Sequence, residues 1–543
     1  MAGGNPDSSS HSLLGMTEDE FDRSLEHPKP NRFEPPVMNA STQHSNFGIR
    51  IRVLLITGVV LISYAYFYEG GGWNQNSRFD LVRAVVEQGT LRIDDYQENT
   101  GDKAFANGHY YSDKAPGLAL LAVPITEVAR PLLRALKVDP TSPGGLLDLA
   151  YCVTVFAVAL PMAAACGCLF WIALRLGSSL GAAAFAALAL GLATPMWAYA
   201  TLFWGHALAG ACLVFAFACA LGVRTAVSSA AEVSWALALG LAAGWATVTE
   251  YPSAPASAMV AVLALALIWG NGPQQRWRVA LGIAAGALPC MVALMAYQHA
   301  AFDSVFHPSY AYYPSGAFSW MTRGYLGLTY PRVDVALKLL FGCRRGLLFS
   351  GPVVLAAPFG LRLLWKQPPT HAAAVAAASI ATYYFLFHAS FSSWPAGWSY
   401  GPRYMAPGLP LLCLGLAPLW DYARPGWRIV LGALATAGVG LTLMAVSVGA
   451  QPPDEFHCPL PQFYWPSFWA GRFSLNLGTV LIPAEQGTNH VHGAFNLGEL
   501  LGLHGLTSVL PLLLVWGLAA FLWIWINRTA QSAQRRSSTS LAN

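Results

Sequence analysis

Long runs of apolar residues, separated by polar stretches, divide most of this chain into segments. Each run is continuous rather than alternating, and most have about the 20 residues that an α-helix needs to cross a membrane. The pattern predicts about twelve transmembrane helices, at residues 51–67, 147–174, 179–196, 205–223, 233–249, 254–270, 279–299, 347–365, 371–388, 404–420, 428–448 and 505–526. We therefore expect an all-α, polytopic integral membrane protein.

Residues 117–136 form a further apolar run, but its second half carries charges. Glu127, Arg130 and Arg134 would be costly inside a bilayer, so we predict an interfacial helix or hairpin here. With both termini in the cytosol, every short cytosolic loop then carries Lys or Arg beside a helix end, as the positive-inside rule requires. This topology places four long segments on the outer face, at residues 68–146, 300–346, 389–403 and 449–504.

The polar stretches also predict the domain organisation. Residues 1–49 are polar and Pro-rich, and we expect a disordered cytoplasmic tail without a signal peptide. A main transmembrane module is expected at 50–448, with the first outer loop at 68–146 inside it. An outer-face loop region at 449–504, a last transmembrane helix at 505–527 and a second cytoplasmic tail at 528–543 follow.

Composition narrows the function further. Charged residues make up only 11% of the 543 residues, and the net charge of +4 is too small to indicate a nucleic-acid partner. Seven of the nine cysteines fall in apolar runs, whereas Cys343 and Cys458 lie in loops, so one disulfide is possible. His490 and His492 alone are too few ligands for a metal, and we predict neither a metal nor a cofactor.

The first outer segment concentrates the candidate chemistry. It holds eight acidic residues between Glu69 and Asp113, beside a membrane face. Residues 77–88 are amphipathic and predict a juxtamembrane helix that contains Asp80. Asp80 and Asp113 are the candidate catalytic carboxylates, and Lys114 could hold a phosphate as a point charge. The alternatives are solvated loop carboxylates and a lysine that extends from the membrane interface to the headgroups.

Further candidate substrate-binding residues lie where outer segments meet helix ends. Arg403 precedes a predicted span, where an unpaired arginine is costly, so we expect a lipid phosphate or a carboxylate as its partner. Arg345 is a weaker candidate of the same kind, and both could instead be anchors among the headgroups. His206 and Glu250 could bind sugar hydroxyls or act as interfacial anchors. Trp398 could stack on a sugar or belong to the aromatic belt.

Several short motifs resemble one family. The run Asn-Gly-His-Tyr-Tyr-Ser-Asp-Lys-Ala-Pro-Gly at residues 107–117 resembles the signature of the first periplasmic loop in bacterial aminoarabinose transferases. These enzymes belong to the GT-C glycosyltransferases, together with the protein O-mannosyltransferases. Ser77-Arg78-Phe79, followed by Gln88-Gly89-Thr90, resembles a second segment of that loop, and WPAGWSYGPR at 394–403 resembles a loop of related bacterial members.

The resemblance implies a GT-C-like membrane fold and an inverting sugar transfer. The donor would be a polyprenyl-phosphate-linked sugar, and the acceptor a glycan, a lipid or a protein. An Asp of the first outer loop would act as base, and Lys or Arg groups, Lys114 and Arg403 first, would hold the lipid phosphate. Arg78 and Tyr111 lie within the matching motifs and join the substrate-binding candidates. The implied location is a bacterial inner membrane, with the active face periplasmic.

One departure from the family is clear. Where its Asp-Glu pair aligns, this sequence has Gln75-Asn76, and an amide cannot deprotonate an acceptor. The base would then be Asp80, with Asp113, Asp94 or Asp95 behind it. Two other interpretations stay open: a transporter or flippase of a lipid-linked substrate, and a catalytically silent, polyprenyl-phosphate-binding envelope protein. The spans hold few internal charges, which argues against a transporter.

Overall fold

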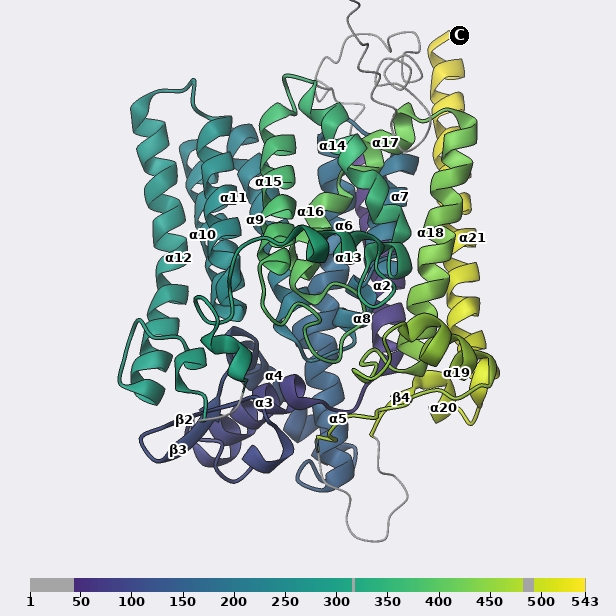
Figure 1. Cartoon of the computed structure of the whole chain (residues 1–543). Coiled ribbons are helices and arrows are strands. Elements are labelled where there is room, and N and C mark those ends of the chain that lie inside the picture. The colour runs from purple at the N-terminus through teal and green to yellow at the C-terminus, as the bar shows by residue number, and fades with distance from the viewer. Residues whose placement is uncertain (1–42, 315–317, 482–492, 543) are drawn as a thin grey trace, which may run out of the picture.

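A computed structural model describes residues 43–314, 318–481 and 493–542 of the chain. Helices dominate the structure, and the long ones run side by side in a bundle whose outer segments gather at one end (Figure 1). The predicted N-terminal tail falls largely on residues 1–42, outside the described part, and α2 begins at Gln43. At the other end, α21 continues through the predicted second tail to Ala542.

Within the described residues, eight helical segments are long and apolar enough to cross a membrane. They are α2 (Gln43–Ala65), α5 with α6 (Pro143–Thr154 and Leu160–Arg175, joined by a π-helical turn), α9 (Gly205–Thr225), α10 (Ser229–Thr249), α12 (Pro273–Phe302), α15 (His371–Ala389), α18 (Pro425–Val448) and α21 (Leu510–Ala542). Three shorter apolar helices are α7 (Leu180–Leu192), α11 (Ala254–Leu267) and α14 (Ala357–Trp365). The all-α, polytopic fold is confirmed, while the count of twelve spans stays a prediction.

The predicted span at 404–420 is helical but broken into pieces. A 3-10 turn at Arg403–Gly408 precedes α16 (Leu409–Cys413) and α17 (Leu416–Tyr422). Pro407 and Pro410 lack the backbone N–H groups that a continuous helix would use here. Each piece is therefore too short to cross a membrane alone.

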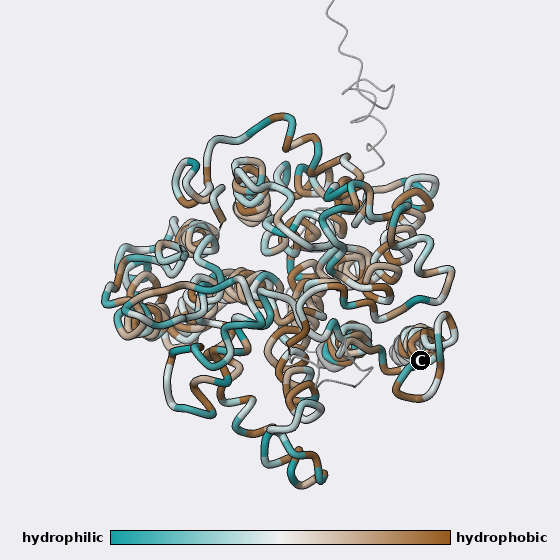
Figure 2. Tube along the Cα trace, turned by 60° about the horizontal axis from the view of Figure 1, so that its bottom comes forward, coloured by the Kyte–Doolittle hydropathy of each residue, from teal (hydrophilic) through white to brown (hydrophobic). Residues whose placement is uncertain are grey.

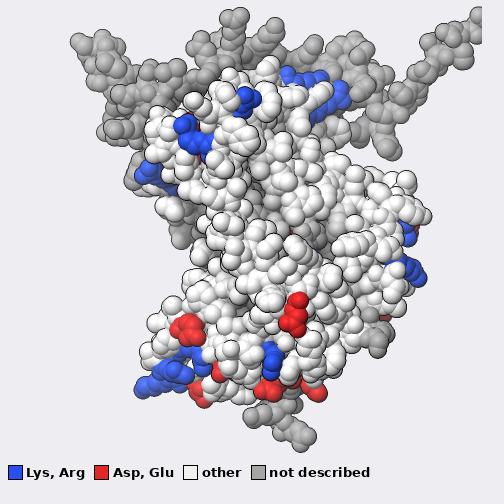
Figure 3. Space-filling view, turned by 90° about the vertical axis from the view of Figure 1, so that its left-hand side faces the viewer, with Lys and Arg blue, Asp and Glu red and all other residues white. Residues whose placement is uncertain are grey.

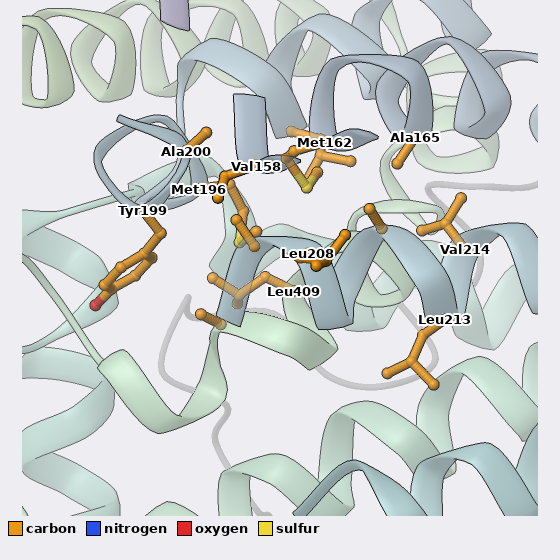
Figure 4. Close-up of a cluster of buried hydrophobic side chains, with 14 of the residues drawn as sticks. Val158, Met162, Ala165, Met196, Tyr199, Ala200, Leu208, Leu213, Val214 and Leu409 are labelled. Carbon is orange, nitrogen blue, oxygen red and sulfur yellow. The ribbon is translucent and has the colours of Figure 1, made fainter. Parts of the chain in front are cut away.

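The hydrophobic core lies between the helices of the bundle, next to the end that carries the outer segments. Side chains from α6, α8 (Met196–Ala200), α9 and α16 meet there, among them Met162, Leu208 and Leu409 (Figure 4). Because lipid tails are as apolar as these side chains, such packing stabilises a membrane protein mainly through van der Waals contact. Tyr199 directs its hydroxyl out of this cluster and donates to the Tyr400 carbonyl at 2.6 Å, which ties the core to the outer segments.

The first outer segment folds into short elements below the bundle. They are α3 (Trp73–Arg83), the antiparallel strands β2 (Lys103–Ala106) and β3 (His109–Ser112), and α4 (Gly117–Ala135). The helix predicted at 77–88 is α3 with a π-helical turn that runs to Gln88, but α3 starts earlier and is buried throughout 74–82 rather than lying on a surface. The α4 helix, predicted to be interfacial, is not among the eight spanning segments.

The first and last outer segments are joined directly. Strand β1 (Phe67–Tyr68) pairs antiparallel with β4 (Phe495–Asn496), and α20 (Leu497–Leu500) follows. The remaining outer helices are α13 (Val333–Phe341) and α19 (Trp465–Trp469). Hydrophilic segments cross the end of the bundle that faces the viewer in Figure 2. In Figure 3, Lys and Arg dominate the opposite end, whereas Asp and Glu gather at this one together with further Lys and Arg. The orientation in the membrane stays a prediction.

Glu69 is buried where these two outer segments meet, and its Oε1 accepts a hydrogen bond from the Ala450 N–H at 2.7 Å. Burial raises the pKa of Glu69 from 4.5 to about 8, against the lowering effect of that hydrogen bond. The folded protein thus keeps a proton that the unfolded chain releases, so this contribution to stability is complete below pH 4.5 and is lost as the pH rises to about 8. We expect Glu69→Gln to flatten the fall of the thermal midpoint over this range, because the Gln amide does not ionise. The Gln side chain can still accept the hydrogen bond from the Ala450 N–H. An equally steep fall in the variant would contradict this assignment.

Candidate functional site

A cavity of about 1050 Å³ opens at the outer end of the bundle. Its wall has a charged side and an apolar, aromatic side. The charged and ionisable side chains on the wall are Arg78, Asp102, Lys114, His206, Glu250, Arg344, Arg403 and Asp454. The apolar wall includes Trp204, Phe318, Trp320, Met321, Leu326, Leu328, Phe387, Phe391 and Trp398. Segments from residue 72 to residue 479 thus build one site.

Lys114 follows β3 and lies between two carboxylates of the first outer segment. Its Nζ is 2.9 Å from Asp102 Oδ2 and 2.8 Å from Asp113 Oδ2. Burial alone would lower the pKa of the Lys114 ammonium, but Asp102 and Asp113 outweigh it and raise that pKa, so Lys114 stays charged. Asp113 is fully buried and also accepts hydrogen bonds from the Ser77 and Tyr313 hydroxyls. Asp102 is therefore the member of this group whose carboxylate faces the cavity.

A second group connects α3 with the ends of α9 and α10. Glu250 Oε1 lies 2.8 Å from Arg78 Nη2 and 3.0 Å from His206 Nδ1. Burial alone would raise the pKa of Glu250, but the His206 and Arg78 side chains outweigh it and hold that pKa at about 2. Arg78 also donates to Asn74 Oδ1 and to the Ala115 carbonyl, both at 3.1 Å. Glu250 thus neutralises the charge of Arg78, and each of its three nitrogens donates a hydrogen bond within the protein.

Arg403 differs from the other cations of the cavity. Its Nε donates to His206 Nε2 at 2.9 Å, its Nη1 donates to the Ala396 carbonyl at 3.2 Å, and its guanidinium lies 4.1 Å from the Trp204 ring centroid. An imidazole that accepts at Nε2 carries its proton on Nδ1, where it donates to Glu250. No carboxylate of the described residues forms an ion pair with Arg403. The cavity thus holds an oriented guanidinium whose charge is not balanced by a carboxylate.

The aromatic side of the cavity begins beside this cation. Ring contacts run from Trp320 to Phe391, with centroids 5.2 Å apart, and from Phe391 to Tyr404 at 4.7 Å. The Arg403 guanidinium in turn lies 5.8 Å from the Tyr404 ring centroid. A ligand with an anionic group and an apolar chain matches this arrangement, because the group and the chain would meet complementary surfaces.

A disulfide fastens one edge of the cavity. Cys343 and Cys458, 115 residues apart in the sequence and with Cα atoms 5.0 Å apart, form the bridge that the sequence left possible. Next to it, Arg344 Nη2 lies 3.0 Å from Asp454 Oδ1, and both side chains line the cavity. The bridge therefore holds together two wall segments that are distant in the sequence.

Removal of this disulfide is expected to destabilise the protein. Because the bridge closes a long loop, Cys343→Ser should lower the free energy of unfolding by about 2–4 kcal/mol. Thermal unfolding in detergent measures the effect, and a reductant should lower the midpoint of the wild type but not that of the variant. Cys152→Ser, at a half-buried free cysteine, is the control. Equal midpoints for wild type and Cys343→Ser would show that the bridge does not stabilise the fold.

Six of the candidate site residues line the cavity: Arg78, Lys114, His206, Glu250, Trp398 and Arg403. The others do not. Asp113 contacts Lys114 from behind the wall, and Tyr111 packs on Phe302 with ring centroids 5.4 Å apart. Arg345 is buried and donates to the carbonyls of residues 395 and 397. Asp80 is fully buried, accepts from Asn99 Nδ2 at 3.2 Å, and has a pKa that burial raises well above its usual range.

Many cavity residues were not singled out from the sequence, among them Asp102, Asp454 and Trp204. Asp102 resembles the other loop carboxylates of the first outer segment, and only the β2–β3 fold brings it to Lys114. Asp454 forms its ion pair with Arg344 because the Cys343–Cys458 disulfide brings together two segments that are 115 residues apart in the sequence. Trp204 could have been considered, because it lies two positions before the candidate His206 at a helix end. His490 and His492 lie outside the described residues. Among the residues that the structure describes, no group of three or more His, Cys, Asp or Glu side chains could hold a metal ion.

Fold and cavity together define a polytopic helical membrane protein with a charged and aromatic site at one end of its bundle. No family model matches the sequence, and no curated protein matches it. Among solved structures, the chain is similar to ArnT from Cupriavidus metallidurans bound to undecaprenyl phosphate, with 20% identity, 77% of this chain and 68% of ArnT covered, and a TM-score of 0.47. It is also similar to the oligosaccharyltransferase AglB from Archaeoglobus fulgidus in complex with an inhibitory peptide and a dolichol-phosphate, with 13% identity, 82% and 62% covered, and a TM-score of 0.44. Both similarities are of fold, at low sequence identity.

Proposed function

We propose that this protein is a membrane glycosyltransferase that moves a sugar from a polyprenyl-phosphate-linked donor to an acceptor hydroxyl. One observation carries the proposal: Arg403, a cation without a carboxylate partner among the described residues, lies where the charged and the aromatic sides of a large cavity meet. A polyprenyl phosphate has the matching chemistry, since its anionic head is joined directly to a long apolar chain.

The leaving group of this reaction is the lipid phosphate. When the bond between the anomeric carbon and the phosphate oxygen breaks, negative charge develops on the phosphate. A preorganised guanidinium stabilises that charge without reorganising at the moment of reaction. Arg403 is preorganised by its stacking on Trp204 and its bond to His206. Lys114, the other cation predicted to hold the phosphate, lies instead between Asp102 and Asp113, with Nζ at 2.9 and 2.8 Å from their carboxylates, so we assign the phosphate to Arg403.

The base of this reaction has to reach the acceptor hydroxyl. We assign it to Asp102, the carboxylate of the first outer segment that lines the cavity. Its partner Lys114, with Nζ 2.9 Å from Asp102 Oδ2, fixes the position of the carboxylate. Asp102 takes the proton of the acceptor hydroxyl, the hydroxyl oxygen attacks the anomeric carbon, and the polyprenyl phosphate departs from the opposite side, which inverts that carbon.

The remaining carboxylates of the site have other partners. Glu250 is bound by Arg78 and His206, and it sets the orientation of His206 behind Arg403. Asp454 is bound by Arg344 at the edge that the disulfide fastens. We assign both to the support of the site, because Glu250 orients His206 and Asp454 lies at the edge that the disulfide fastens.

The cavity end is proposed to face the periplasm of a bacterium. Two features support this orientation. Disulfides persist in oxidising compartments, and Cys343–Cys458 lies at this end. Lys and Arg dominate the other end in Figure 3, as cytosolic loops require.

Carrier binding tests the proposal directly. The purified protein in nanodiscs would be titrated with radiolabelled undecaprenyl phosphate and, in parallel, with undecaprenol, which has the same chain without the phosphate. If the cavity holds the phosphate, the phosphate form should bind at least about tenfold more tightly, since hydrogen bonds to charged groups contribute about 1.5–3 kcal/mol. Equal affinity for the two lipids would contradict a phosphate site in the cavity.

A further inference from the structure

The start of α3 contains a buried corner of glycines and amides that takes no part in the proposed chemistry. Gly70, Gly71 and Gly72 all have positive φ angles, of 72°, 144° and 141°, which other residues rarely adopt. A Cβ at Gly71 would lie 2.9 Å from the Thr479 carbonyl oxygen, so this turn packs directly on a segment of the last outer loop. Gln75 and Asn76 follow at once and are buried.

The amide of Asn76 connects three separate parts of the chain. Its Nδ2 lies 2.8 Å from the Asn99 carbonyl, 3.1 Å from the Val480 carbonyl and 3.4 Å from the Thr479 carbonyl. Its Oδ1 accepts from the Gly72 N–H at 3.2 Å, which also closes the first turn of α3. Both ends of this side chain are therefore occupied by backbone groups.

Two neighbouring amides extend the same network. Asn99 Nδ2 donates to the Leu481 carbonyl at 2.9 Å. Gln75 Nε2 donates to the Gly71 carbonyl, and its Oε1 accepts from the Phe203 N–H at 3.3 Å. The carbonyls at 479, 480 and 481 thus all receive hydrogen bonds from side-chain amides.

We infer that Asn76 and Asn99 are positioning residues that hold segment 477–481 in place as one wall of the cavity, and that Gln75 supports them by fixing the glycine turn on which this segment packs. None of the three lines the cavity, whereas Leu477, Gly478 and Thr479 do. Across the corner, Gly72 lines the cavity as well. The wall therefore depends on amides that do not touch a ligand.

The network also requires amides rather than carboxylates. The groups that face Asn76 Nδ2 are carbonyl oxygens, which can only accept, so a carboxylate there would leave them without a donor and add a repulsive charge. The requirement for an amide is less strict at position 75. A carboxylate there could still accept from the Phe203 N–H, and the Gly71 carbonyl also receives a hydrogen bond from Gln451, at 2.8 Å. An acidic residue at position 76 is thus incompatible with this corner.

The test compares Asn76→Asp with Asn76→Ala, using hydrogen exchange of peptides that cover 475–481. Asn76→Asp has nearly the size of the native side chain, so a mere packing role predicts that it is tolerated better than Ala. We expect the reverse order, with exchange at 477–481 at least about tenfold faster in Asn76→Asp than in wild type. This arm needs no catalytic activity, so it stands apart from the proposed function. Wild-type exchange in Asn76→Asp would overturn the inference.

A second arm rests on the proposed function and measures transfer kinetics. Asn76→Asp should raise KM for the lipid-linked donor at least about tenfold while kcat changes less, because the wall and not the reacting groups is displaced. If position 76 were instead the place of the base, the new carboxylate would raise kcat, and that result would also overturn the inference. Asn271→Asp, in the exposed turn between α11 and α12, is the control and should match wild type in both arms.

Discussion

Asp102→Asn is expected to abolish sugar transfer while the protein still binds its carrier. General-base catalysis contributes about 10²–10⁴-fold in rate, and we expect kcat to fall by about that factor. Carrier affinity should stay the same or rise, because the substitution removes a negative charge that lies 2.9 Å from Lys114. Single-turnover transfer and carrier titration in the same nanodisc sample measure the two effects separately.

Two further variants locate the base unambiguously. Glu98→Gln changes an exposed carboxylate of the same outer segment and should transfer sugar like wild type. Asp80→Asn tests the base that the sequence favoured, in a side chain that is fully buried and does not line the cavity. Wild-type transfer by Asp102→Asn, or loss of kcat in Asp80→Asn with the fold intact, would contradict the assignment to Asp102.

Arg403→Ala is expected to remove most of the carrier affinity. Loss of one partner from a buried charge pair typically costs about 2–5 kcal/mol, so we expect undecaprenyl phosphate to bind about a hundredfold more weakly. Arg403→Lys should give an intermediate affinity, since lysine keeps the charge but loses the planar stacking on Trp204. Binding of undecaprenol, which lacks the anion, should change little in either variant.

A matched charge removal controls this experiment. Arg92→Ala removes an exposed cation of the first outer segment and should leave carrier binding unchanged. If Arg403→Ala bound undecaprenyl phosphate as tightly as wild type, the guanidinium would not be the phosphate ligand. Lys114, which lies between Asp102 and Asp113, would then be the next cation to test.

The hydrophobic pattern predicted the helical fold well because each apolar run has to be buried in lipid or protein. The pattern could not predict where helices break. Pro407 and Pro410 divide the run at 404–420, and the runs at 179–196 and 347–365 give helices shorter than a full span. Residues 77–88 show a similar limit: their amphipathic pattern predicted a surface helix, but other outer segments cover α3 on all sides at 74–82.

The candidate site was predictable where a polar residue stood at the end of an apolar run. His206, Glu250 and Arg403 occupy such places, and all three line the cavity. Local sequence could not separate Asp102 from Asp80, because that distinction depends on which carboxylate the β2–β3 hairpin brings to Lys114. The role of Asn76 was equally hidden, since its partners at 479 and 480 lie some four hundred positions away in the sequence.

The most direct test of the central claim is a transfer assay on the purified wild-type protein. Nanodiscs would receive undecaprenyl-phosphate-linked radiolabelled sugars and an acceptor pool of envelope lipids. The assay would measure how much label leaves the carrier and how much free undecaprenyl phosphate is released. We predict that label leaves the carrier, that one undecaprenyl phosphate is released for each sugar transferred, and that Arg403→Ala prevents both. Label that crosses the bilayer still joined to its carrier, or that stays on the carrier with every sugar and acceptor, would contradict a glycosyltransferase.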